Sequence, residues 1–93
     1  MRRRIMIAIR ERRLIRLVRS SGRIVLEPHC YGCLYGSAQR GADVVLGCAP
    51  TLGWLRVVLD AETEFDLLDE TFPGPRAGYV RNDTRMGRVI LQL

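Results

Sequence analysis

The strongest constraint on the fold is a series of short apolar segments, separated at close intervals by glycine, proline and other turn residues. From Leu14 onward apolar and polar side chains alternate, so that Ile15 and Leu17 share one face of a predicted strand. Further strands are predicted at 23–27, 42–49, 54–59, 64–68 and 87–93, with turns at 20–22, 49–53 and 60–63. Short strands at such spacing are typical of a small β-barrel or a strongly bent antiparallel sheet.

The chain ahead of the first strand has a different period. Ile5, Ala8 and Ile9 recur at three- and four-residue spacing, which predicts a short helix over 2–12. Pro28 is predicted to end the strand at 23–27, because proline cannot donate a hydrogen bond to a central ladder. Three glycines make 32–41 a predicted connection, and Asp83 is predicted to cap one helical turn that ends at Met86. The expected fold class is mainly β, with a short N-terminal helix.

Length and composition limit the kind of protein. A chain of 93 residues leaves no room for a second domain, so 1–93 is interpreted as one unit. The longest uncharged stretch, 44–55, is too short to cross a membrane, and the apolar run 5–9 is too short for a signal peptide. Three cysteines, an odd number, favour reduced thiols over a disulfide framework. We therefore expect a cytoplasmic protein without a membrane partner.

Charge is sorted along the chain. All fifteen basic residues are arginine, which excludes lysine chemistry but suits bidentate binding of phosphate or carboxylate. Residues 1–23 hold nine arginines and one glutamate, a net charge of +8, whereas residues 56–72 hold one arginine and six acids, a net charge of −5. A basic segment of this kind either binds an acidic partner or pairs with the acids of its own chain.

Four strings of residues are distinctive together. The two most specific are Glu27-Pro28-His29-Cys30-Tyr31-Gly32 and Leu68-Asp69-Glu70-Thr71-Phe72-Pro73-Gly74-Pro75-Arg76, and the others are 8–15 and the Trp-led stretch 54–60. They resemble the WYL domain family, in particular small stand-alone bacterial proteins related to it, over nearly the whole chain. The tripeptide that names the family falls near Val44-Val45-Leu46, where only Leu46 matches.

The resemblance implies an Sm-like small β-barrel preceded by a helix, in a single WYL-like domain over 1–93. WYL domains usually belong to bacterial transcription regulators and defence-associated proteins, where they are thought to bind nucleic acid or a nucleotide-like effector. The helix-turn-helix that usually accompanies them is not part of this sequence, so the resemblance also implies a separate DNA-binding protein partner.

The cysteines have two interpretations, as ligands of a metal site and as structural residues. His29, Cys30, Cys33 and Cys48 have the residue types of a tetrahedral zinc site, with Cys30 and Cys33 in Cys-x-x-Cys spacing. His29 and Cys30 are neighbours, however, and on a strand they would point to opposite faces. Cys30 and Cys33 as a redox pair would need a helix N-terminus or a cation, and the flanking segments read as strand and loop. We therefore expect no metal and no cofactor.

Two other groups have a functional and a structural reading. His29 is the only histidine. It acts either as a general base or a phosphate contact in an open site, or as a residue hydrogen-bonded to backbone at a strand end. Asp60, Glu62, Glu64 and Asp66 alternate on one strand face, where they form either a solvated edge or a partner for the arginines. No triad spacing, phosphate loop or Rossmann motif is present.

The sequence therefore predicts a non-enzymatic regulatory or ligand-sensing module. It would bind nucleic acid or a nucleotide-like anion by charge-assisted contacts of guanidinium groups. The candidate binding residues are Arg10, Arg13, Arg16, His29, Tyr31 and Arg76. The alternative is a protein-interaction or structural module that forms a homo-oligomer or docks on a larger partner, because so small a barrel cannot cover its apolar faces. An enzyme is the third possibility.

Overall fold

The computed structural model describes residues 2–34, 42–60 and 62–93. These residues form one helix, one 3-10 turn and six strands, in the order α1 (Arg2–Glu11), β1 (Arg13–Arg19), β2 (Gly22–Leu34), β3 (Ala42–Ala49), β4 (Gly53–Leu59), β5 (Glu64–Thr71), η1 (Thr84–Met86) and β6 (Arg88–Gln92). The fold class predicted from the sequence is confirmed, since the chain is mainly β with a short N-terminal helix and a strongly bent antiparallel sheet.

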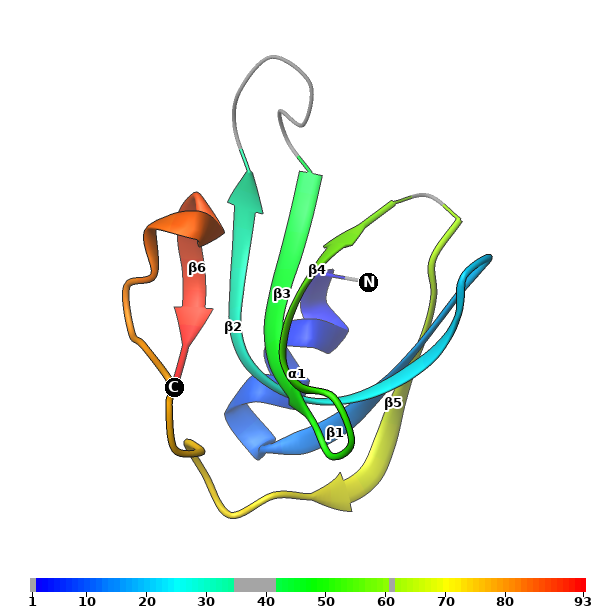
Figure 1. Cartoon of the computed structure of the whole chain (residues 1–93), viewed down its shortest axis with the longest axis horizontal. Helices are drawn as coiled ribbons and strands as arrows, with labels where there is room; N and C mark the ends of the chain where they lie inside the picture. The colour runs from blue at the N-terminus through cyan, green and yellow to red at the C-terminus, as the bar shows by residue number, and fades with distance from the viewer. Residues whose placement is uncertain (1, 35–41, 61) are drawn as a thin grey trace.

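The strand order is β4-β3-β2-β1-β5, with β6 added beside β2. The first half of β2 pairs with β1, and its second half pairs with β3 on one side and with β6 on the other. Figure 1 shows β2 curving from the right, where it runs beside β1, into the centre, where it lies between β3 and β6. A closed barrel would need a ladder between β4 and β5, and the ladders among the described residues include none.

The bend in β2 corrects one prediction. Pro28 does not end the strand, because β2 continues from Gly22 to Leu34. Between Pro28 and Cys30 the register with β3 shifts by a bulge, at the point where β2 changes partners. His29 is the residue that this bulge leaves without a register partner. Pro28 lies just before it, opposite Gly47, where β2 has left β1 and has not yet met β6. A bulge interrupts the regular ladder, and proline is tolerated within sheets at such places.

Other boundaries agree with the sequence to within a few residues. The strand at 42–49, the turn before 54–59 and the strand at 54–59 lie where the sequence predicts them. Of the turn predicted at 60–63, residue 61 lies outside the described residues. Asp83 caps η1, its side chain accepting a hydrogen bond from the backbone N–H of Arg85. The strand predicted at 64–68 extends to Thr71, and Gly32, predicted to begin a connection, lies within β2. Residues 35–41 of that connection lie outside the described residues.

The core has two parts. Ile5, Ala8 and Ile9 of α1 pack against Ile15 and Leu17 of β1 and against apolar residues of the other strands. A second cluster joins Cys30, Leu34, Val44, Leu46 and Met86 between β2, β3 and η1. The helix therefore buries one side against the sheet and leaves its other side in solvent. Among the described residues no helix is long and apolar enough to cross a membrane.

Candidate functional site

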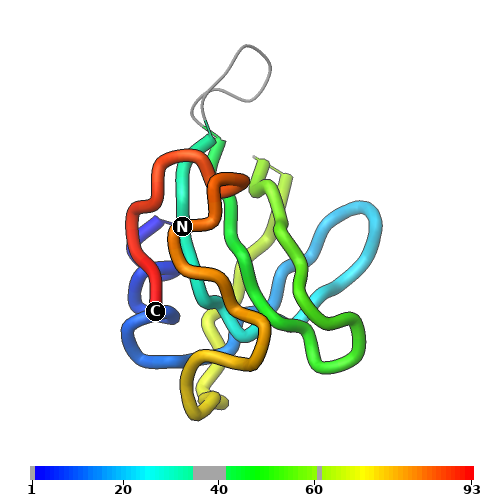
Figure 2. Tube along the Cα trace, turned by 60° about the vertical axis from the view of Figure 1, so that its left-hand side comes forward, coloured from blue at the N-terminus to red at the C-terminus, as the bar shows by residue number. Residues whose placement is uncertain are grey.

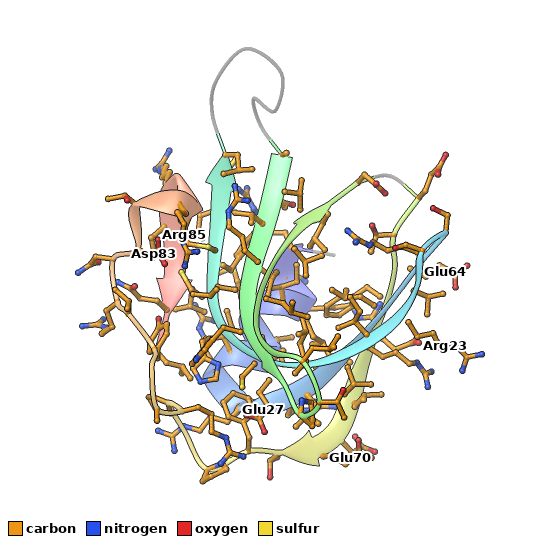
Figure 3. All side chains as sticks on the ribbon, viewed as in Figure 1. Arg23, Glu27, Glu64, Glu70, Asp83 and Arg85 are labelled. Atoms are coloured by element: carbon orange, nitrogen blue, oxygen red, sulfur yellow. The ribbon has the colours of Figure 1, made fainter. Side chains whose placement is uncertain are left out.

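The two most specific strings of the sequence meet in space. Arg76 lies in the stretch Phe72–Tyr79, which follows β5 and is called the strap below. Arg76 Nε donates to Glu27 Oε1 at 2.7 Å, and Arg76 Nη2 donates to Glu27 Oε2 at 2.8 Å. Hydrogen bonding by Arg76 lowers the pKa of Glu27. Figure 3 shows Glu27 at the lower end of the sheet, and the gold and orange strap passes over the sheet in Figure 2.

His29 lies beside this pair and is fully buried. Its Nδ1 is 2.8 Å from the Glu27 carbonyl oxygen, and its Nε2 is 3.1 Å from the Arg76 backbone nitrogen. Because a backbone N–H can only donate, Nε2 is the acceptor and the ring proton resides on Nδ1. Burial lowers the pKa of His29, which favours this neutral ring. Both ring nitrogens are thus occupied, so His29 is neither an open-site contact nor a general base in this structure.

Three aromatic rings enclose the imidazole. The ring of Trp54 meets it edge-on with centroids 4.7 Å apart, Tyr79 is tilted at 5.0 Å, and Phe72 is stacked at 5.3 Å. Trp54 Nε1 donates to the Ala77 carbonyl oxygen at 3.1 Å, and the Tyr79 hydroxyl donates to the His29 carbonyl oxygen at 3.2 Å. Glu27, His29 and Arg76 therefore fasten the strap to the sheet and spend their polar groups on one another and on backbone.

Arg13 and Arg16 pair with acids of the same chain. Arg13 Nη2 lies 3.1 Å from Asp69 Oδ1, and Arg16 Nη2 lies 2.8 Å from Asp66 Oδ2, so β1 and β5 are joined by two ion pairs. Internal pairing was one of the two readings of the basic segment, and it is confirmed for these two arginines. Glu64 and Glu70 of β5 point away from the body of the molecule in Figure 3.

Tyr31 is fully buried and joins three elements. Its hydroxyl accepts a hydrogen bond from Arg2 Nε of α1 and donates one to Asp43 Oδ1 of β3, both at 2.8 Å. Burial raises the pKa of Tyr31, so the hydroxyl keeps its proton. The buried ring is not available for a base to stack on, contrary to the binding role predicted for Tyr31.

Arg10 differs from the other candidates because it lies on an open surface. With Arg2, Arg3, Met6 and Ile7 it lines a shallow depression of about 470 Å³ on the solvent side of α1, which is called the α1 face below. Arg3 and Arg10 are exposed at its two ends, and Met6 and Ile7 are half-buried between them. The α1 face therefore combines guanidinium groups with a small apolar floor.

The helix places this charge against its own dipole. Arg2, Arg3 and Arg4 occupy the first turn of α1, which contains no acid. The N-terminus of a helix carries a partial positive charge, so cations there are unfavourable and a bound anion is favourable. The Arg4 guanidinium lies 5.0 Å from the centre of the Phe65 ring, a cation–π contact that places it apart from the α1 face.

The cysteines and His29 do not gather into a metal site. Among the described residues no three histidine, cysteine or acidic side chains come together in a way that could hold an ion. Cys30 is buried in the second core cluster, where desolvation raises its pKa to about 11. A thiol of that pKa is neither a ready zinc ligand nor a reactive redox centre. His29 uses both nitrogens within the strap contacts.

Of the five residues of the α1 face, the candidate binding residues of the sequence include only Arg10 and omit Arg2, Arg3, Met6 and Ile7. Arg3, Ile7 and Arg10 follow the helical spacing i, i+4, i+7, which is the signal that groups them on one helix face. Glu27 was not recognised as the partner of Arg76, and no local pattern connects residues 49 positions apart.

The chain was compared with models of protein families, with curated proteins and with solved structures, and none of them matches it. The resemblance to WYL domains therefore remains a prediction from the sequence.

Proposed function

We propose that the protein is a non-enzymatic module that binds single-stranded nucleic acid through the α1 face. The observation that carries the proposal is the depression in which Arg2, Arg3 and Arg10 surround Met6 and Ile7. Guanidinium groups bind phosphate through parallel charge-assisted hydrogen bonds, and they also stack on bases. Of the six binding residues predicted from the sequence, Arg10 is retained, and Arg2 and Arg3 join it.

Charge supports an anionic ligand at this place. The first turn of α1 carries three arginines and no acid, an arrangement that costs helix stability until an anion approaches. A phosphate near Arg3 would face the free N–H groups of the helix start as well as the side chain. Arg3 and Arg10 are seven residues apart on the helix, a rise of about 10 Å, so they would contact different phosphates of one strand.

The apolar floor favours a single strand over a duplex. In a duplex the bases are stacked inside, and a surface helix meets mainly phosphates. In a single strand the bases are free to lie against apolar or planar groups between the phosphate contacts. Met6 and Ile7 are half-buried between the two exposed arginines and would provide that surface.

The test is binding of a labelled single strand, measured by fluorescence anisotropy at several salt concentrations. We expect the affinity to fall as the salt concentration rises. In the double variant Arg3→Gln/Arg10→Gln, the slope of log affinity against log salt should become shallower by about 0.7 for each arginine removed. The matched control is Arg23→Gln, which removes the same charge from another exposed guanidinium, outside the α1 face. Equal effects of Arg10→Gln and Arg23→Gln would show that net charge, not the α1 face, determines binding.

The cellular role extends this proposal. Three free cysteines, one of them buried, are compatible with a reducing compartment, and we place the protein in the cytoplasm. As in the WYL-like proteins that the sequence resembles, binding would be passed to a separate DNA-binding partner in transcription regulation. Co-purification of this chain with a DNA-binding protein, lost on addition of a single strand, is the outcome expected for such a sensor.

A protein-interaction module is the second candidate function. A groove of about 290 Å³ lies between the start of β2 (Arg23, Ile24, Val25) and the β3–β4 turn (Ala49, Pro50, Thr51, Leu52). Leu52 is 66 % exposed at its rim, an unusual position for so large an apolar side chain. Sedimentation equilibrium distinguishes the candidates: a concentration-dependent homodimer that Leu52→Asp abolishes, without nucleic-acid binding, would favour the interaction module.

A further inference from the structure

The strap, Phe72–Tyr79, lies outside the strands and is held to them by contacts that converge on His29. Arg76 N–H donates to His29 Nε2, the Tyr79 hydroxyl donates to the His29 carbonyl oxygen, and the rings of Phe72 and Tyr79 lie against the imidazole. Other contacts do not involve His29: Arg76 pairs with Glu27, and Trp54 Nε1 donates to the Ala77 carbonyl oxygen. At the start of the strap, the Phe72 N–H donates to the Arg12 carbonyl oxygen, and Arg12 Nη1 donates to the Pro73 carbonyl oxygen. A change at the imidazole therefore acts on the Arg76–Tyr79 part of the strap, whereas the Arg12 contacts hold its start.

The attachment requires a neutral imidazole. Nδ1 carries the proton and faces the Glu27 carbonyl oxygen, while Nε2 offers its lone pair to the Arg76 N–H. Protonation at Nε2 would set an N–H against an N–H, so a hydrogen bond would be replaced by repulsion. It would also place a cation in a fully buried position, beside the guanidinium of Arg76.

We propose that the strap is released by acid, because protonation of His29 breaks its contact with Arg76 while the strands remain paired. In this step one proton adds to His29 Nε2, the hydrogen bond from the Arg76 N–H is lost, and that N–H then bonds to water. Release would expose the rings of Trp54, Phe72 and Tyr79 that now enclose the imidazole. The proposal does not depend on the α1 face.

The groups around His29 determine the direction in which its pKa is shifted. Burial is the largest influence and lowers the pKa of His29. The hydrogen bond to the Glu27 carbonyl oxygen and the Glu27 carboxylate raise this pKa, and the Arg76 charge lowers it. Tyr79 of the strap and Cys30 of β2 have pKa values raised to about 12 and about 11, so both are neutral in this range. On β3, Cys48 lies opposite Glu27 in the strand register, and on β4 the neighbouring ring is that of Trp54, which carries no charge.

The sign follows from these shifts. A released His29 regains the ordinary pKa near 6.5, whereas the enclosed ring binds its proton only at lower pH. The released form therefore takes up protons first, and attachment is complete above pH 6.5 and weakens as pH falls below it. The pKa of Glu27 lies below its ordinary 4.5, so a change above pH 4.5 belongs to His29.

The sheet has its own support and should survive release. The larger core cluster joins α1 to the strands through residues outside the strap. The ladders β1–β2, β2–β3 and β3–β4 contain no strap residue. Of the strap residues only Tyr79 packs on the second cluster, at its margin. Local opening with intact strands is therefore the expected response to mild acid.

The test uses amide hydrogen exchange and the fluorescence of Trp54, which is the only tryptophan. Between pH 7 and pH 4.5 we expect the protection factor of the Arg76 and Tyr79 amides to fall at least tenfold more than that of Val45 in β3. In His29→Gln, whose amide oxygen replaces the Nε2 acceptor without titrating, protection should stay constant across this range. Equal loss at the strap and in β3, or the same pH profile in His29→Gln, would overturn the proposal.

Two measurements keep the proposal testable if His29→Gln does not fold. The ring of the only histidine can be followed by NMR in the unaltered protein, and its titration should coincide with the change at the Arg76 amide. In Glu27→Gln the titration of the His29 ring, followed by NMR, should move to lower pH, because the carboxylate favours the charged ring. A midpoint that does not follow the His29 titration, or that disappears in Glu27→Gln, would assign the acid response to Glu27.

Discussion

Arg76 donates hydrogen bonds to both carboxylate oxygens of Glu27, at 2.7 and 2.8 Å, although the two residues are 49 positions apart in the sequence. The Glu27 side chain is 12 % exposed and that of Arg76 is 44 % exposed, so the pair is only partly screened by solvent. This relationship joins the two strings that make the sequence distinctive. It explains their residue types by attachment of the strap to the sheet and not by an open binding site.

Loss of this ion pair should destabilise the fold more than loss of an exposed one. Glu27→Gln leaves Arg76 without its two-bond partner, and we expect a cost of about 1–3 kcal/mol in the free energy of unfolding. The control is Asp66→Asn, which removes the more exposed pair with Arg16 and should cost less than about 1 kcal/mol. Urea denaturation at pH 7 measures both, and equal costs would contradict the central place given to Arg76.

Gly32 should tolerate no side chain. A Cβ at this position would overlap the Met86 carbonyl oxygen and lie 3.0 Å from that of Arg88, and backbone atoms cannot rotate away. Gly32→Ala should therefore displace η1 and β6 from β2 and lower stability by more than about 1 kcal/mol. Ser21→Ala, in an exposed turn, should change stability by less than about 0.5 kcal/mol. A neutral Gly32→Ala would contradict the close approach of η1 to β2.

Asp83 has two roles that substitutions can separate. Its side chain caps η1 through the Arg85 N–H and pairs with the Arg85 guanidinium, and these contacts lower its pKa to about 2. Figure 3 shows the two side chains together at the left edge of the molecule. Asp83→Asn keeps the cap and should cost little, whereas Asp83→Ala should cost about 1 kcal/mol. The contribution of the charged form is present above pH 3.8 and is lost as pH falls toward about 2.

The three cysteines should react at different rates. Cys30 is buried and its pKa is raised to about 11, whereas Cys33 and Cys48 are partly exposed. A thiol reagent at pH 7.5 should therefore modify Cys33 and Cys48 well before Cys30, because the thiolate is the reactive form. Peptide mass mapping at successive times identifies the order. Early modification of Cys30 would contradict its position in the core.

The sequence predicted the elements well because periodicity is a local property. The helix at 2–12, the strand at 42–49 and the Asp83 cap each depend on residues close together in the chain, and all three are present. The strand end predicted at Pro28 is wrong because the bulge beside Pro28 depends on the partners of β2, which the pattern along one strand does not reveal.

The candidate site was harder to predict because it depends on long-range pairing. Arg13, Arg16 and Arg76 are the same residue type as Arg10, and only their contacts with Asp69, Asp66 and Glu27 separate them. The neutral, enclosed state of His29 likewise depends on a backbone N–H 47 positions away. Charge sorting identified which segments could meet, and the fold determined which arginines were left on the surface.

The central claim is that the α1 face binds a single strand, and one comparison of three proteins tests it most directly. Anisotropy titrations at low salt should give the unaltered protein and Arg23→Gln similar affinities, whereas Arg3→Gln combined with Arg10→Gln should bind at least tenfold more weakly. Absence of binding in the unaltered protein, or equal binding by all three, would contradict the claim.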